Sequence, residues 1–422
     1  MPKYSEMNKN ELTALYNSLK ADYEATKAEG LALNMARGVP SPEQLDISEP
    51  MLALSGATRS EDGTDCRNYG MLDGIIEAKR LLSYLLDINP EEIFVGGNAS
   101  LNIMHDMLSF AMLHGTPRSQ SPWCMQSKRK FLCPAPGYDR HFAITEHLGF
   151  ELVTVAMTPD GPDMDAVEEL VKDADVKGIW CVPKYSNPTG CVYSDETVRR
   201  MAALKPAAPD FIIMWDNAYA VHDLYPDAPV LLNLMDELKK NGNEHMALFF
   251  GSTAKITFAG AGVAGVGACA ENLAWIKQHM SIQTISYDKL SQLRHAKFLP
   301  DLAALKAHMA KHAEIVRPKF EMLQEALSPL AELGIAEWTI PLGGYFISID
   351  ITAGSAKRVF TLMKEAGVVM TPAGAVYPYG KDPDDSNLRI APTFPSPEDL
   401  KLAGELLCVC VRLACAEALL EA

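Results

Sequence analysis

A lysine between an apolar run and a glycine-rich stretch is the residue of this chain best suited to covalent chemistry. Lys255 follows the apolar residues 247–251 and precedes the glycines of 260–265. Burying an ammonium group is costly unless its charge is neutralised or used. One common use is the formation of a Schiff base between the amine and a carbonyl compound. Lys255 is therefore a candidate attachment point for a carbonyl-bearing ligand.

Two polar segments upstream each follow an apolar run of the same kind. The Asn-Pro-Thr-Gly segment at 187–190 follows the apolar run 178–182, and the Asp-Asn-Ala-Tyr segment at 216–219 follows the run 211–215. Both place polar side chains just beyond the carboxyl end of an expected strand. Open α/β sheets bind their ligands at that edge, so both segments are candidates for ligand binding.

The order of these three segments resembles that of the fold-type I, pyridoxal-phosphate-dependent aminotransferases, and the resemblance covers nearly the whole chain. It is closest to a divergent bacterial subgroup of class I aspartate aminotransferases. Five more motifs carry the resemblance: Met-Ala-Arg-Gly-Val-Pro at 35–40, Gly-Gly-Asn-Ala-Ser-Leu-Asn at 96–102, Pro-Gly-Tyr-Asp-Arg-His at 136–141, Gly-Gly-Tyr-Phe at 343–346 and Asn-Leu-Arg-Ile-Ala-Pro at 387–392. Each motif alone is moderately specific, but their common order is strongly so.

The resemblance implies pyridoxal 5'-phosphate as the cofactor. Lys255 would hold it as a Schiff base and, once released by the substrate, would move the proton between the substrate's Cα and the cofactor. Asp216 would pair with the pyridine nitrogen and keep it protonated. His141 would lie behind Asp216 as its partner, and a hydrogen-bonded core histidine is nearly as good an interpretation.

Three other side chains would contact the cofactor ring. Tyr219 and the Asn187 amide would donate hydrogen bonds to its phenolic oxygen and so lower the pKa of the imine. Tyr138 would stack on the pyridine face. Asn187 also belongs to the expected substrate site. The implied catalytic residues are Lys255, Asp216 and Tyr219.

The cofactor phosphate needs its own binding site. An apolar helical pattern begins after Ser100, so Asn98, Ala99 and Ser100 are expected at a helix N-terminus. Free backbone N–H groups and the helix dipole favour an anion there, and Ser100 would also serve as a simple N-cap. The Ser252 hydroxyl would add a donor. By resemblance, Tyr69 would reach the phosphate from a neighbouring subunit, which implies a homodimer with shared active sites.

One position departs from the family pattern. Most class I members have an arginine eight residues after the lysine, where it contacts the phosphate, but this chain has Val263. Either the backbone amides of the glycine run 260–265 replace the guanidinium group, or another cation reaches the site.

The substrate residues are also implied by the resemblance. Arg389 would grip the α-carboxylate of the substrate, since a guanidinium–carboxylate pair fixes orientation as well as charge. Gly38 would let the substrate approach the backbone. A dicarboxylate needs a second cation, for which Arg37, Arg140 and Lys289 are candidates; Arg37 is preferred because it adjoins Gly38. The expected reaction moves the amino group of an L-amino acid, aspartate, to a 2-oxo acid, 2-oxoglutarate.

Two alternative functions remain for this sequence. A pyridoxal-phosphate lyase or decarboxylase of the same fold would have an identical cofactor site. A catalytically silent ligand-sensing domain, of the kind that occurs fused to DNA-binding domains, is disfavoured because the N-terminal segment carries no basic patch.

Three other motifs in the chain suggest chemistry that their context argues against. The run 260–265 spells the Gly-x-Gly-x-x-Gly of dinucleotide-binding folds, but it does not directly follow its strand. Ser252 and Lys255 match the Ser-x-x-Lys of acyl-serine enzymes, whose other motifs are absent. His308 and His312 share a helical face without a third metal ligand. A solvated helix face is the favoured interpretation of that pair, and no metal site is expected.

Composition bounds the remaining possibilities. The formal net charge of −16 disfavours nucleic acid and anionic membranes as partners. The nine cysteines are scattered without Cys-x-x-Cys pairs, which supports neither a disulfide framework nor a zinc site. No apolar run approaches the roughly 18 residues of a membrane span, and the N-terminus lacks the apolar core of a signal peptide. A cytoplasmic location is therefore expected.

The fold class expected from these patterns is α/β, with a mostly parallel sheet covered by helices and a smaller, discontinuous α+β domain. Residues 50–287 would form the large cofactor-binding domain, and 1–49 plus 288–422 the small one. Strands are expected at 93–95, 130–133, 151–155, 178–182, 211–215 and 247–251, and in the small domain at 335–340, 344–350, 368–371 and 387–390. Helices are expected at 7–29, 288–327, 354–366 and 396–419, and a loop at 40–50.

Overall fold

The central sheet of the protein has eight strands and is mostly parallel. The computed structural model describes residues 2–54, 58–352 and 354–421. The strand order is β2 (Ile93–Val95), β9 (Ala264–Gly267), β8 (Ala247–Ser252), β7 (Ile212–Asp216), β6 (Val176–Cys181), β3 (Lys130–Ala135), β4 (Glu151–Thr158) and β5 (Gly161–Pro162). Strands β4, β3, β6, β7 and β8 run parallel, whereas β9 is antiparallel to both neighbours. The expected α/β fold class is confirmed.

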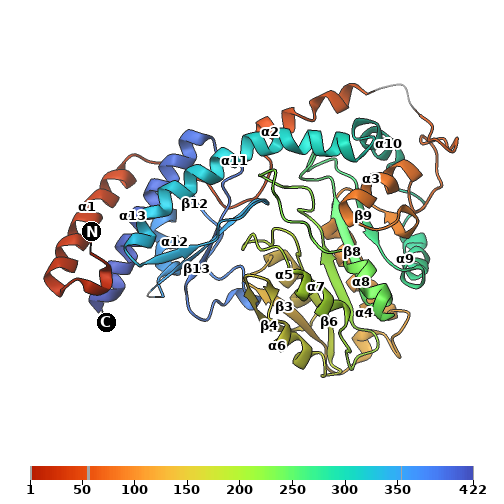
Figure 1. Ribbon diagram of the computed structural model, residues 1–422, viewed down its shortest axis with the longest axis horizontal. Coiled ribbons are helices and arrows are strands. Elements are labelled where there is room, and N and C mark those ends of the chain that lie inside the picture. The colour runs from red at the N-terminus through yellow and green to blue at the C-terminus, as the bar shows by residue number, and fades with distance from the viewer. Residues whose placement is uncertain (1, 55–57, 353, 422) are drawn as a thin grey trace.

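Helices bury both faces of this sheet. Along each central strand, successive apolar residues face opposite clusters: Ile213 and Phe249 belong to one, Met214 and Leu248 to the other. This two-sided burial explains why the strands are continuous apolar runs rather than alternating patterns. The surrounding helices are α3 (Ile76–Leu86), α4 (Ser100–His114), α5 (Asp139–His147), α6 (Met164–Leu170), α7 (Asp195–Ala202), α8 (Leu234–Asn241), α9 (Ala270–Gln283) and α10 (Lys289–Phe298) (Figure 1).

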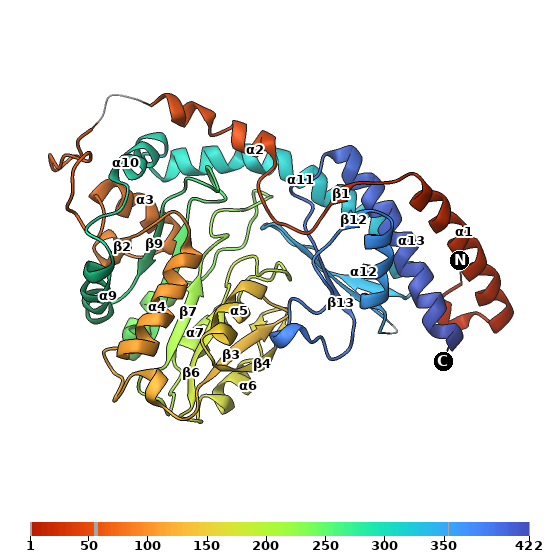
Figure 2. The same cartoon turned by 180° about the vertical axis from the view of Figure 1, so that it is seen from behind.

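A second apolar core lies at the other end of the molecule. It joins the helices α1 (Lys9–Ala28), α11 (Leu302–Glu332), α12 (Ala356–Glu365) and α13 (Pro397–Glu421) with the antiparallel strands β10 (Ala336–Trp338), β11 (Ile347–Ile351) and β13 (Asn387–Ile390). Helix α1 packs on α13, so the two ends of the chain lie side by side, as both views show (Figures 1 and 2). The domain boundaries at 49/50 and 287/288 stay a prediction.

Several local expectations are corrected by the structure. The expected loop at 40–50 contains α2 (Pro42–Asp46) and the start of a 3-10 helix, η2 (Glu49–Ala53). The single helix expected over 288–327 is two helices, because Pro300 disfavours helical geometry at the residue before it and Asp301 caps the N-terminus of α11. The expected strand at 368–371 is the short β12 (Val368–Val369), which pairs with β1 (Leu33–Asn34) apart from the three-stranded sheet.

The glycine run 260–265 ends in a strand rather than opening a helix. Its last residues begin β9, and a Cβ on Gly265 would lie 2.6 Å from a methyl carbon of Leu82 in α3. The glycine is thus needed for close packing of the helix on the strand.

The remaining elements are short. Further 3-10 helices are η1 (Tyr4–Glu6), η3 (Pro90–Glu92), η4 (Trp123–Met125), η5 (Glu244–Met246) and η6 (Pro378–Gly380). Within the described ranges, no helix combines the length and the apolar character needed to cross a bilayer. The cysteines are free, and no cluster of three or more metal-ligating side chains occurs among the described residues.

Candidate active site

Lys255 lies on a single helical turn directly after β8. The amides of Ile256 and Thr257 both donate to the carbonyl oxygen of Thr253, at 2.9 and 2.8 Å, and so form that turn. The Lys255 ammonium lies 4.9 Å from the centre of the Tyr219 ring. Desolvation lowers the pKa of the Lys255 amine; the nearby Asp216 carboxylate opposes this shift. The turn therefore presents an amine that loses its proton more readily than an exposed lysine does.

Asp216 is the last residue of β7 and is 3% exposed. Its Oδ2 lies 3.1 Å from Nε2 of His141, whose ring stacks on Trp180 with 4.1 Å between centroids. Its Oδ1 is buried and has no hydrogen-bond partner among the described residues. A buried carboxylate oxygen without a donor is costly. This oxygen fits the protonated pyridine nitrogen of pyridoxal phosphate, which would supply the missing donor.

The side chains expected around the cofactor ring come from three loops. Tyr219 follows β7 and is buried, and burial raises the pKa of its phenol. Tyr138 immediately precedes α5, and burial raises its pKa to about 12. Its ring meets that of His141 edge-on at 4.9 Å. Asn187 is buried as well, and its amide oxygen accepts a hydrogen bond from Arg389.

The segment expected to bind phosphate lies at the N-terminus of α4. Ala99 is the N-cap residue and offers no capping side chain, and Ser100 is the first helical residue. Ser100 is therefore not the simple N-cap that the sequence also allowed. A Cβ on Gly262 would lie 2.9 Å from the carbonyl oxygen of Asn98 and 3.0 Å from the amide of Ala254. The α4 N-terminus and the lysine turn thus meet at Gly262.

Val263 has a structural role in the lysine turn. Its side chain is buried in the apolar core. Its amide donates to Oγ1 of Thr253 at 2.9 Å, and its carbonyl accepts from the Thr253 amide at 2.9 Å. Ser252 directly precedes Thr253, and its hydroxyl accepts a long hydrogen bond from the Ala254 amide at 3.4 Å. Val263 therefore anchors the turn from β9, at the position where most relatives of the expected class have arginine.

Arg389, in β13, is 8% exposed and held from three sides. Its Nη1 donates to Oδ1 of Asp139 at 2.8 Å and to Asn187 at 3.2 Å. Its Nε and Nη2 both donate to the hydroxyl of Thr371, at 3.3 and 3.1 Å. The Phe346 ring lies 4.8 Å from the guanidinium carbon. A carboxylate side chain thus already occupies part of the surface with which this guanidinium would bind a substrate carboxylate.

The expected substrate segment 35–40 reaches the same place. A Cβ on Gly38 would lie only 2.3 Å from the Phe346 ring, so a glycine is required for this contact. Among the candidate cations, Arg37 and Arg140 are exposed. The ammonium of Lys289 instead donates to the carbonyl oxygen of Gly70 at 2.8 Å. Lys289 therefore holds the loop that carries Tyr69.

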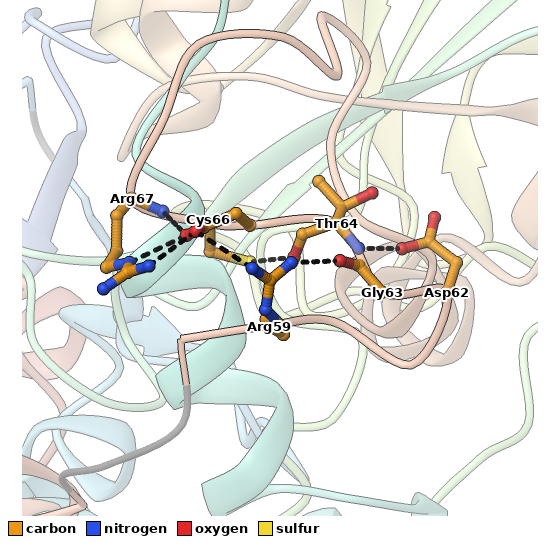
Figure 3. Close-up of polar contacts among 7 residues, drawn as sticks. Arg59, Asp62, Gly63, Thr64, Cys66 and Arg67 are labelled. Atoms are coloured by element: carbon orange, nitrogen blue, oxygen red, sulfur yellow. Dashed lines mark hydrogen bonds and ion pairs between the residues drawn. The ribbon is translucent and has the colours of Figure 1, made fainter.

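Tyr69 is 80% exposed in the single chain. The loop that precedes it is built around the carboxylate of Asp65, which accepts from the guanidinium groups of Arg67 and Arg59 at 2.6 and 3.5 Å (Figure 3). Arg59 also donates to the carbonyl oxygen of Gly63 at 2.9 Å. These contacts give the loop that precedes the exposed Tyr69 a defined shape.

Sequence reasoning gave no role to three residues that the structure places in the site. Asp139 and Thr371 bind Arg389, and Trp180 supports His141. Asp139 lies within the 136–141 motif, where an acid next to the expected stacking tyrosine was the available signal. Thr371 and Trp180 carry no such signal, because only the folded chain brings them to their partners.

The histidine pair on α11 overturns an expectation. His308 and His312 are not on a solvated face: they are 5% and 3% exposed. Their side of α11 packs against the lysine turn and α2, where the Nε2 of His308 lies 2.7 Å from the Ile256 carbonyl oxygen.

Comparisons with known proteins bear on the family of the whole chain. A family model described as aspartate amino-transferase matches residues 7–422. A Corynebacterium glutamicum protein named aspartate aminotransferase is 46% identical over 405 residues, covering 95% of this chain and 94% of its own. The crystal structure of an aspartate transaminase from the same species has a TM-score of 0.96 at 44% identity, covering 98% of this chain and 99% of its own.

A more distant structure shows the fold alone. It is an alpha-aminoadipate aminotransferase of Thermus thermophilus, complexed with N-(5'-phosphopyridoxyl)-L-leucine. It is 20% identical, with a TM-score of 0.72 over 93% of this chain and 95% of its own.

Proposed function

This chain belongs to the aspartate aminotransferase family, and from that membership we propose that it transfers the amino group of L-aspartate to 2-oxoglutarate. The protein is an aminotransferase, and its cofactor is pyridoxal 5'-phosphate. The choice of aspartate is supported by the similarity to a protein named aspartate aminotransferase at 46% identity. Two features together support the reaction type. The pKa of the Lys255 amine is lowered, and the buried Asp216 carboxylate has one oxygen without a hydrogen-bond partner among the described residues.

When bound, pyridoxal phosphate supplies an electron-withdrawing ring that stabilises negative charge at the substrate's Cα. Asp216 holds the ring nitrogen protonated through Oδ1, and His141 orients Asp216 from behind. Lys255 would hold the cofactor and would move the proton at the substrate's Cα. Its lowered pKa suits this role, because the free amine is the form that accepts a proton.

The other site residues bind and orient. Tyr219 and Asn187 would donate hydrogen bonds to the ring oxygen, and Tyr138 would cover the ring face. Backbone N–H groups of Asn98, Ala99 and Ser100 at the α4 N-terminus, together with the Ser252 hydroxyl, would bind the phosphate. Arg389 orients the α-carboxylate of the substrate, and Gly38 lies beside it. Arg37 binds the carboxylate of the substrate's side chain.

We propose further that the active unit is a homodimer in which Tyr69 completes the phosphate site of the partner. The exposed Tyr69 precedes Gly70, whose carbonyl oxygen is bound by Lys289 of α10, and η2 contacts the same helix. Other large apolar side chains are exposed on η2 and at the end of α9. These include Leu52, Ile282 and Ile285, at 58%, 88% and 62% exposure. Apolar surface of this kind marks protein interfaces. A cytoplasmic location is proposed as well, in line with the free cysteines.

The proposed reaction is tested by its two halves. Aspartate added to the purified protein should convert the bound cofactor to pyridoxamine phosphate, and 2-oxoglutarate should restore the original absorption spectrum. Release of carbon dioxide without pyridoxamine phosphate would instead identify a decarboxylase. Borohydride reduction should attach the cofactor to Lys255, and Lys255→Ala should abolish turnover while the circular dichroism spectrum is kept. A cofactor-bearing peptide with any other lysine overturns the assignment of the site.

A further inference from the structure

A buried cluster of neutral side chains holds the backbone of the lysine turn through two of its carbonyl groups. The cluster consists of His222, Tyr345, His308, His312 and Gln44. These residues come from the loop after β7, the approach to β11, helix α11 and helix α2. The mechanism described above uses none of them.

The cluster supplies donors to two consecutive carbonyl groups. The Lys255 carbonyl oxygen accepts from Nε2 of His222 and from the Tyr345 hydroxyl, both at 3.3 Å. The Ile256 carbonyl oxygen lies 2.7 Å from Nε2 of His308. Carbonyl groups at the end of a helical turn have no partner within the turn, and a buried carbonyl without a donor costs free energy. Side chains thus complete the hydrogen bonding of the turn that carries Lys255.

The tautomers of the histidines follow from their acceptors. A carbonyl oxygen can only accept, so His222 and His308 both carry their proton on Nε2. Nδ1 of His312 lies 3.1 Å from the Gln44 amide, which also donates to the Tyr345 hydroxyl at 3.1 Å. His312 is therefore an acceptor at Nδ1. Gln44 is fixed in turn, because its amide oxygen accepts from the backbone N–H of Ser41 at 3.0 Å.

All three imidazoles are uncharged near neutral pH. Burial, with the charge of Lys255 as the next cause, lowers the pKa of His222 to about 3. Burial and the neighbouring His308 lower that of His312 to about 4, and burial lowers that of His308. The cluster thus donates hydrogen bonds at the lysine turn without adding a positive charge beside the Lys255 amine.

From this geometry we propose that His222, His308 and Tyr345 are positioning residues for Lys255: by holding the carbonyl groups of Lys255 and Ile256, they fix the amine in its half-buried place. Gln44 donates to His312 and Tyr345, and the His312 ring packs edge-on against that of His308. The inference rests on the proposed role of Lys255 and adds that the rate of proton transfer depends on donors located on α2, α11 and the β7 loop. Loss of a donor should loosen the turn and let water reach the amine.

Two variants at one position separate hydrogen bonding from packing. His308→Gln keeps an N–H donor on a side chain of similar length, whereas His308→Leu keeps the volume and removes the donor. We expect His308→Leu to lower kcat for transamination by at least tenfold while KM for the amino acid stays within threefold, because Arg389 is untouched. His308→Gln should stay within threefold of the parent in both constants. Tyr345→Phe, a milder change at the Lys255 carbonyl, should reproduce the loss of kcat in part.

A second readout needs no turnover. In the cofactor-free protein, the pH dependence of Lys255 acetylation, followed by mass spectrometry, gives the pKa of the amine. His308→Leu should shift its midpoint upward by at least half a unit, because water then stabilises the ammonium form. The control is Leu327→Ala, which creates a cavity at a fully buried position of α11 in the other core. It should lower the melting temperature without moving the midpoint.

The outcomes separate this inference from the proposed function. If borohydride attaches the cofactor to Lys255 and His308→Leu leaves kcat and the midpoint unchanged, the positioning role is refuted and the proposed reaction stands. The role is equally refuted if Leu327→Ala shifts the midpoint as far as His308→Leu does, because general destabilisation then explains both. If His308→Leu does not fold, Tyr345→Phe decides by the same two readouts.

Discussion

At the scale of single residues, the site is defined by which polar atoms have partners and which do not. Arg389 donates four hydrogen bonds to Asp139, Asn187 and Thr371, whereas Asp216 keeps one oxygen free of any donor among the described residues. A carboxylate that binds both Nη atoms of Arg389 therefore has to displace one of its partners, whereas Asp216 gains a partner when the cofactor binds.

Replacing Asp139 tests the exchange at Arg389. Asp139→Asn removes the negative charge that competes with the substrate carboxylate, so KM for aspartate and Kd for dicarboxylate inhibitors should fall roughly three- to tenfold, equivalent to about 1 kcal/mol. Steady-state kinetics and calorimetric titration measure the two constants. Asp139→Glu retains the charge and serves as the control. A higher KM in Asp139→Asn would show that the carboxylate assists binding instead.

Replacing Asp216 should cost more activity than replacing Tyr219. Asp216→Ala removes one member of a buried ion pair, at about 3–5 kcal/mol, or roughly 10²–10⁴ in rate if the loss is felt in the transition state. Tyr219→Phe removes one hydrogen bond to a charged atom, at about 1.5–3 kcal/mol. Comparing kcat/KM of both variants with the parent measures the order. Near-normal activity of Asp216→Ala would mean that the cofactor binds in another orientation.

At the scale of elements, the site depends on how closely separate segments approach one another. Segment 35–40 reaches Phe346 only because residue 38 has no side chain. A Cβ on Gly38 would overlap the ring that lies against Arg389.

Gly38→Ala should push the Phe346 ring away and disturb Arg389. Overpacking of this kind costs about 1–3 kcal/mol, and we expect KM for both substrates to rise by about tenfold or more. Gly260→Ala is the matched control, because a Cβ at Gly260 has nothing within 4 Å. Equal KM values in the two variants would show that Gly38 does not contribute to substrate binding. Steady-state kinetics with both substrates decide the matter.

The free energy of unfolding should depend on pH through His312, which lies on helix α11. The unfolded chain protonates this imidazole as pH falls through its ordinary pKa of 6.5, whereas the folded chain does so only at about 4. The free energy of unfolding should therefore decrease as pH falls across this window, by about 3 kcal/mol for this residue. His312→Gln cannot titrate, so its urea denaturation midpoint should fall less than that of the parent between pH 6.5 and 4. Parallel curves would contradict the assignment.

The elements differ in how far they could be predicted from sequence. Central strands such as β7 and β8 are apolar on both faces, so composition alone indicates them. Strand β9 is half glycine, and its pairing with β2 and β8 comes from tertiary packing under α3. The motifs placed Lys255 and Asp216 just beyond strand ends beforehand, and they placed Arg389 within the expected strand 387–390. The donor on His308 could not be predicted, because the pair His308 and His312 reads equally as a solvated helix face. The donor on His222 could not be predicted either, because this residue lies in the loop after β7, which has no regular period.

At the scale of the whole molecule, the proposed homodimer gives the exposed Tyr69 a role in a second subunit. We predict that dilution dissociates the dimer and that cofactor binding weakens over the same range of protein concentration. Tyr69→Phe should mainly raise the dissociation constant of pyridoxal phosphate, with the dimer intact. Light scattering during turnover, combined with fluorescence titration of the cofactor, measures both. A monomer with full activity and tight cofactor binding would contradict the shared site.

The Asp216 oxygen without a donor in the described part of the chain connects the amount of this protein to the supply of its cofactor. A ligand that binds only the folded chain stabilises it by RT ln(1 + [L]/Kd), about 2.7 kcal/mol when its concentration is a hundred times Kd. A shortage of pyridoxal phosphate removes that contribution and enlarges the unfolded fraction, which proteases degrade. Cofactor scarcity would therefore lower the number of protein molecules as well as the activity of each one.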